Sequence, residues 1–111
     1  MQAAAASGAV AQLSLSESSP GHFAAGGPLT FATARRAREA GLAAFRTSSA
    51  REIQVDCGGI TASDSAGMTV LLDWLAFAKH SGRSLHFGNL PAQVQDIARI
   101  SDTLELLQRG V

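Results

Sequence analysis

The chain has 111 residues, of which 46% are hydrophobic, and its nine basic residues balance nine acidic ones. A chain of this length forms a single domain with a modest core. Zero net charge and a pI near 6.8 argue against a nucleic-acid-binding protein, which usually carries a basic surface. The single cysteine, Cys57, excludes an internal disulfide and fits a reducing compartment.

The N-terminal segment MQAAAASGAVAQL lacks both a basic region and a long apolar stretch, so it does not resemble a signal peptide. The longest apolar block, residues 67–78, is interrupted by Asp73 and is shorter than the roughly 20 apolar residues that cross a bilayer. We therefore expect no direct membrane insertion and a cytoplasmic protein that reaches a membrane only through a partner. The Ala-rich residues 1–9 predict a flexible tail, and residues 10–111 form the predicted domain.

The first half of the domain predicts two strands and a helix. Residues 10–18 and 20–27 have strand patterns, the second closed by a Gly-Gly-Pro turn at Gly26–Pro28. Apolar residues then recur every three or four positions from Phe31 to Phe45, which predicts a helix with Thr30 as its N-cap. We interpret the nearby arginines as a solvated face rather than a phosphate-binding stripe: Arg35, Arg36, Arg38, Arg46 and Arg51.

The second half predicts strands that alternate with helices. Glu52–Asp56 and residues 83–87 alternate as strands do, and a helix over Ser65–His80 is followed by a terminating Gly82. Pro91 marks the start of a further helix, and Ser101 is the predicted cap of a last short one. This order predicts an α/β fold in which helices pack on a small mixed β-sheet that contains parallel pairs.

The junction between the central strand and the long helix is crowded with Gly, Ser and Asp. Asp64 stands where a carboxylate accepts hydrogen bonds from the first turn of a helix. Residues 63–67, Ser-Asp-Ser-Ala-Gly, approximate a nucleophile elbow, but the first glycine of that motif is missing. His80 would lie roughly 22 Å from Ser65 at 1.5 Å per helical residue, and His86 offers no better partner. These departures argue against a hydrolase.

Two other kinds of site are also excluded by composition and spacing. The loop contains no Gly-Lys-Ser/Thr, so the positive charge of a phosphate-binding loop is absent. Asp56, Asp64, Asp73 and Cys57 have no metal-ligand spacing, and Cys57 on a central strand is typical of a buried small apolar residue. We therefore expect no catalytic residue, no cofactor and no metal.

The long helix carries two apolar arcs. Met68, Leu71, Leu72 and Leu75 form one, and Val70, Trp74 and Phe77 form the other. The helix is then either sandwiched between the sheet and neighbouring helices, or it presents part of the second arc to a partner protein with Trp74 as an anchor. The three histidines, His22, His80 and His86, form no constellation and are assigned to the surface.

Together, the strand IQVDCGGI, the loop TASDSAGM and the helix TVLLDWLAFAKHSG resemble the STAS domain family over residues 13–107. The family mark is Asp-Ser/Thr-small-Gly at the start of a helix, here Asp64-Ser65-Ala66-Gly67. Gly58 departs from the pattern, since many members have Ser there. Residues 64–79 and 90–107 are most similar to the MlaB group, the STAS subunits of ABC complexes that transport phospholipid.

The resemblance implies a non-enzymatic subunit at the cytoplasmic face of the inner membrane. It would bind the ABC ATPase and, through it, the permease and lipid-binding components of a transporter that maintains outer-membrane lipid asymmetry. The implied partner-binding residues are Asp64, Ser65, Ala66, Gly67, Thr69 and Asp73. The alternative within the same family is an anti-sigma-factor antagonist, in which a kinase-like partner phosphorylates the serine that matches Ser65.

Overall fold

The computed structural model describes residues 11–111, so the predicted tail at residues 1–9 lies outside the described residues. Strands and helices follow one another along the chain as β1 (Ser14–Ser19), β2 (His22–Leu29), α2 (Ala34–Thr47), β3 (Glu52–Ser63), α3 (Ser65–His80), β4 (Ser84–Gly88), α4 (Ala92–Ile100) and α5 (Leu104–Arg109).

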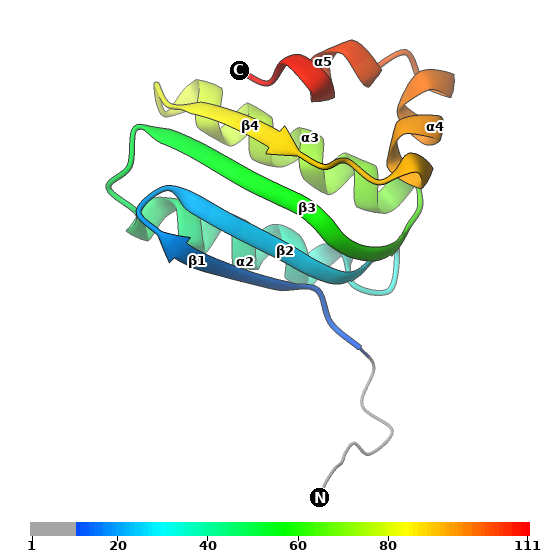
Figure 1. The fold of residues 1–111 in the computed structure, drawn as a ribbon, viewed down its shortest axis with the longest axis horizontal. Helices are drawn as coiled ribbons and strands as arrows, with labels where there is room; N and C mark the ends of the chain where they lie inside the picture. Colours follow the sequence, from blue (N-terminus) through cyan, green and yellow to red (C-terminus); the bar gives the residue numbers. More distant parts are fainter. Residues whose placement is uncertain (1–10) are drawn as a thin grey trace, which may run out of the picture.

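The strands form one mixed sheet in the order β1-β2-β3-β4. The β1–β2 pair is antiparallel, and the β2–β3 and β3–β4 pairs are parallel. Helices α2 and α3 lie on the same face of the sheet, and α4 and α5 lie at its β4 edge (Figure 1). The predicted α/β fold, a small mixed sheet with helices packed on it, is confirmed.

The core lies between the sheet and helices α2 and α3. Its aromatic centre is Phe45, whose ring meets Phe23 at 5.2 Å and Trp74 at 5.6 Å, both edge to face. Trp74 is fully buried, and its indole N–H donates to the carbonyl of Arg38 at 3.4 Å. Helix α3 is therefore sandwiched between the sheet and a neighbouring helix, which is the first of the two interpretations of its apolar arcs. The second, in which Trp74 is an exposed anchor for a partner protein, is excluded. Gly41 makes room for this indole, since a Cβ there would lie 2.3 Å from it.

The predicted turn at Gly26–Pro28 is wrong, because these residues belong to β2. The last pair between β1 and β2 is Ser14 with Gly26, but β2 continues to pair with β3 as far as Leu29. Pro28 lacks an N–H and is tolerated in a strand where one neighbouring strand has already ended. Pairing with β3 therefore overrides the local turn signal.

Strand β3 is also longer than the predicted Glu52–Asp56. It runs to Ser63. Its side chains alternate between the core and the exposed face as far as Cys57, and beyond that point two irregularities in its pairing with β2 interrupt the alternation. Between the pairs Ala24–Asp56 and Gly26–Gly59, β3 contains one residue more than β2. This β-bulge turns Ile60 back toward the core, and a second extra residue in β3, between the pairs Gly27–Ile60 and Pro28–Ala62, does the same for Ser63.

Two predicted helix caps are corrected. Helix α2 begins at Ala34, not Phe31, because the Thr33 hydroxyl accepts from the N–H of Thr30 at 3.0 Å and donates to the carbonyl of Pro28 at 2.8 Å. These bonds form a turn that precedes the helix. Ser101 ends α4 rather than starting α5, whose N-cap is Thr103.

The other expectations for buried and exposed residues are confirmed. Cys57 is buried, and burial, followed by the neighbouring charge of Asp56, raises the pKa of its thiol to about 12. The three histidines and the five arginines assigned to the surface are exposed.

Candidate docking site at the start of helix α3

Asp64 connects the start of α3 to the turn between β2 and α2. Its Oδ1 accepts from the N–H of Gly67 at 3.0 Å, as the predicted N-cap does, and its Oδ2 accepts from the N–H of Phe31 at 2.9 Å. These two hydrogen bonds, the one from Phe31 being the stronger influence, hold the pKa of Asp64 below its ordinary value. Asp64 therefore remains ionised at neutral pH and fixes two segments that are 33 residues apart.

Gly67 faces the interior of the protein. It is buried, and a Cβ at this position would lie 1.9 Å from the carbonyl oxygen of Leu29 in β2. The glycine is required because the first turn of α3 passes directly over the backbone of β2. Gly67 therefore lies outside the exposed surface, and its expected contact with a partner is corrected to a contact with β2.

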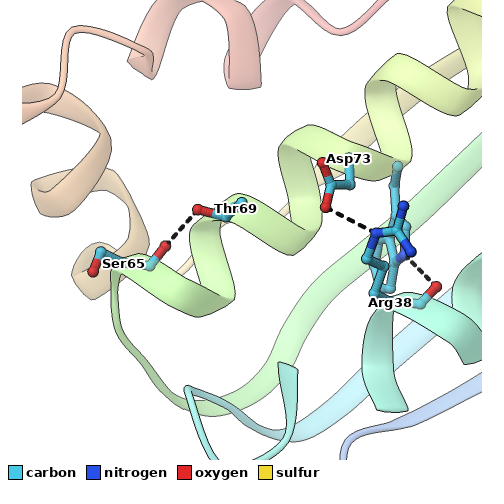
Figure 2. A network of polar contacts seen from close by, with 5 residues as sticks. Arg38, Ser65, Thr69 and Asp73 are labelled. Atoms are coloured by element: carbon cyan, nitrogen blue, oxygen red, sulfur yellow. Dashed lines mark hydrogen bonds and ion pairs between the residues drawn. The ribbon is translucent and has the colours of Figure 1, made fainter. Parts of the chain in front are cut away.

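Ser65 and Thr69 point to the solvent from the first two turns of α3 (Figure 2). The Thr69 hydroxyl donates to the backbone carbonyl of Ser65 at 2.9 Å. The Ser65 hydroxyl itself makes no hydrogen bond with any described residue. Ala66, between the capping Asp64 and the buried Gly67, is half-buried and small. The start of α3 thus presents small side chains to the solvent, among them one hydroxyl that has no hydrogen-bond partner in the described part of the chain.

Asp73 lies two turns further along α3 and is paired with α2. The Nε of Arg38 lies 3.0 Å from the Asp73 Oδ2, with 51% of the arginine side chain and 41% of the aspartate side chain exposed (Figure 2). The pair joins the solvent edges of α2 and α3. Both side chains remain accessible to a partner, so the exposed side of α3 continues in polar character from Ser65 to Asp73.

An apolar side chain beside this surface is missed by the sequence pattern. Phe31, predicted within the helix, is 78% exposed in the turn whose backbone is held by Asp64. The pairing of Thr30 with Thr33 is the signal that could have identified this turn. Ile100, at the end of α4, is also exposed. It lies close to α3, because the hydroxyl of the next residue, Ser101, is 3.6 Å from the sulfur of the buried Met68. Two single exposed apolar side chains do not form a contiguous patch, so they do not by themselves mark a binding site.

His80 does not lie beside Ser65 as the base of a serine hydrolase would. His80 is at the far end of α3, where its Nδ1 lies 2.8 Å from the carbonyl of Ala76. Within residues 11–111, no three His, Cys, Asp or Glu side chains are grouped so that they could hold a metal ion. No helix among these residues is long and apolar enough to cross a membrane.

A family model described as an MlaB-type STAS domain matches residues 15–108 of the chain. The chain belongs to the MlaB-like STAS family. The match includes the whole sheet except Ser14, and all of α3 and its Asp64-Ser65-Ala66-Gly67 start. No curated protein matches the chain.

Two solved structures confirm the STAS fold. The unphosphorylated anti-sigma factor antagonist SpoIIAA superposes with a TM-score of 0.61 at 12% identity, over 79% of this chain and 82% of SpoIIAA. A sulfate transporter family protein from Wolinella succinogenes superposes with a TM-score of 0.62 at 16% identity, over 79% of this chain and 70% of that one. At these identities the likeness concerns the fold alone.

Proposed function

We propose that this STAS protein is a non-enzymatic subunit that binds the ATPase of a phospholipid-transporting ABC complex. It would act at the cytoplasmic face of the inner membrane and contact the permease and lipid-binding components through the ATPase. The proposed docking site consists of Asp64, Ser65, Ala66, Thr69 and Asp73. The observation that carries the proposal is the match to the MlaB-type STAS family over nearly the whole domain.

The exposed side of α3 supports a docking role for these residues. The Ser65 hydroxyl is free to bond to a partner, and the small Ala66 allows a partner backbone to come close. Asp64 is held by two backbone N–H groups, so the turn that presents Ser65 is rigid before binding. A preformed surface loses little conformational entropy on association.

The alternative is an anti-sigma-factor antagonist that is controlled by phosphorylation of Ser65. The exposure of Ser65 at the N-terminus of a long helix favours this candidate, because the helix dipole stabilises a phosphate there. The fold shared with SpoIIAA is equally compatible with both functions. The partner and the state of Ser65 therefore distinguish them.

The test is a tagged pull-down from extract of the native organism, with mass spectrometry of the bound proteins and of Ser65. An ABC ATPase among the bound proteins, with Ser65 unmodified, is the expected result. A kinase-fold protein together with phosphorylated Ser65 would overturn the transporter role and establish the alternative.

A further inference from the structure

A groove of about 630 Å³ runs between α3 and the C-terminal residues that include α5. Its walls are apolar and consist of Leu72, Leu75 and Ala76 from α3 with Leu106 and Val111 from the C-terminal segment. None of the proposed docking residues at the start of α3 lines it. Sites for small molecules have volumes of about 300–1,000 Å³ and mostly apolar walls, so the groove has the size and lining of a ligand site.

The groove has two different ends. At one end is Thr103, whose hydroxyl lies 3.6 Å from the sulfur of Met68, near the start of α3. At the other end is Val111, whose N–H donates to the carbonyl of Leu85 at the start of β4 at 3.0 Å. The groove therefore extends along the second half of α3, from Leu72 to Lys79.

Positive charge gathers at the Val111 end. Lys79 lies in the last turn of α3 and Arg109 in the last turn of α5, and both line the groove. Arg83 also lines it, but its guanidinium already donates to the carbonyls of three residues, Phe45, Ser48 and Ala50. The side chains of Lys79 and Arg109 make no hydrogen bond or ion pair with the described residues, and no lining side chain is acidic.

We propose that this groove binds a medium-chain fatty acid, with its alkyl chain between Leu72, Leu75 and Leu106 and its carboxylate at Lys79 and Arg109. The helix rises by seven steps from Leu72 to Lys79, about 10 Å at 1.5 Å per residue, which suits a chain of medium length. Two free cations at one end of an apolar groove complement a ligand that has one anionic end. This proposal does not depend on the transporter role.

A peptide helix fits the groove less well. A helix with its side chains is about 10–12 Å across. An amphipathic helix carries charged residues on both sides of its apolar face, so a groove that binds it should carry complementary charges along both of its edges. Here the cations lie at one end, and the walls between Thr103 and Lys79 are apolar. The distribution of charge therefore favours the fatty acid.

The test is a calorimetric titration of the full chain with dodecanoate below its micelle concentration. Saturable binding at one site is expected, and dodecyltrimethylammonium, which has the same chain and the opposite charge, should bind at least tenfold more weakly. The double substitution Lys79→Ala and Arg109→Ala should weaken dodecanoate binding by about tenfold. Ala76→Trp should abolish it, because Ala76 is exposed and a larger side chain there fills the groove without entering the core.

Circular dichroism of each variant separates a loss of binding from a loss of folding. The proposal is overturned if the folded wild-type chain does not bind dodecanoate, or if it binds both amphiphiles equally. It is also overturned if Ala76→Trp leaves dodecanoate binding unchanged, since the ligand would then lie elsewhere. If Ala76→Trp instead weakens binding of a partner protein while the wild type ignores dodecanoate, the groove is a protein interface and the fatty-acid site does not exist.

Discussion

The four residues Asp64-Ser65-Ala66-Gly67 divide into a structural half and a free half. The carboxylate of Asp64 accepts hydrogen bonds from the backbone N–H groups of Phe31 and Gly67, and Gly67 packs directly against the backbone of β2. Ser65 is exposed with an uncommitted hydroxyl, and Ala66 beside it is small and half-buried. The motif thus has two parts. Asp64 and Gly67 fix where the helix begins, and Ser65 and Ala66 form a surface that does not stabilise the fold.

The comparison predicts that substitutions in the structural half affect the stability of the fold, whereas substitutions in the free half affect the binding of a partner. Changes to the structural half should lower the free energy of unfolding. Changes to the free half should leave it nearly unchanged, because exposed substitutions away from caps and cores usually alter it by less than about 0.5 kcal/mol. The predictions below run from the largest expected effect to the smallest.

Gly67→Ala should destabilise the protein by about 3 kcal/mol or more, because the new Cβ would collide with the backbone carbonyl of Leu29. Chemical denaturation monitored by circular dichroism measures the effect. Gly88→Ala is the matched control, since a Cβ there meets nothing within 4 Å and the stability should stay near that of the wild type. Equal losses from both substitutions would show that α3 does not lie close to β2.

Asp64→Ala should destabilise the protein by about 1–2 kcal/mol, because it removes an N-cap and the tether to the β2–α2 turn. Denaturation of Ser65→Ala provides the comparison within the same motif and should give a change below about 0.5 kcal/mol. If Ser65→Ala costs as much as Asp64→Ala, the division into two halves is wrong.

The contribution of Asp64 should also depend on pH. Its pKa lies below the ordinary value of 3.8 because the carboxylate accepts hydrogen bonds from the N–H groups of Phe31 and Gly67. A lowered pKa in the folded state gives stability that is present above the unfolded pKa and is lost as pH falls through the folded pKa. The stability advantage of the wild type over Asp64→Asn should therefore be constant near neutral pH and shrink below about pH 4. An advantage that stays constant into that acidic range would contradict the role of the ionised carboxylate.

The exposed pair of Arg38 and Asp73 should have the smallest effect. A double-mutant cycle with Arg38→Ala and Asp73→Ala should give a coupling free energy of about 0.2–1 kcal/mol that falls as salt is added. A coupling well above this range would mean that the pair is a structural link between α2 and α3 rather than part of the free surface.

The fold was largely predictable because its strongest signals are local and agree with one another. Helix α3 combines an apolar pattern, a capping Asp64 and a terminating Gly82, and its predicted bounds are those observed. The predictions failed where pairing between distant segments overrides local residue preference. Gly26–Pro28 have turn composition, yet they pair with Gly59, Ile60 and Ala62 of β3.

The candidate site was predictable only in part for the same reason. The capping role of Asp64 follows from its place before an apolar helical pattern. Gly67 faces inward because it packs against Leu29 of β2, which lies 38 residues earlier in the chain. No local sequence pattern indicates a contact between residues so far apart. The exposure of Phe31 depends on the turn formed by Thr30 and Thr33, and the helical spacing of its neighbours concealed that turn.

The most direct test of the docking role is the affinity of the chain for the ABC ATPase of its own organism, measured for the wild type, Ser65→Ala and Ser65→Asp. All three should have nearly the same stability, because Ser65 is exposed and its hydroxyl makes no hydrogen bond with any described residue. Ser65→Asp should weaken binding more than Ser65→Ala, since it adds charge and bulk next to Asp64 on the proposed interface. Three equal affinities would contradict the account and place the contact with the ATPase elsewhere on the protein.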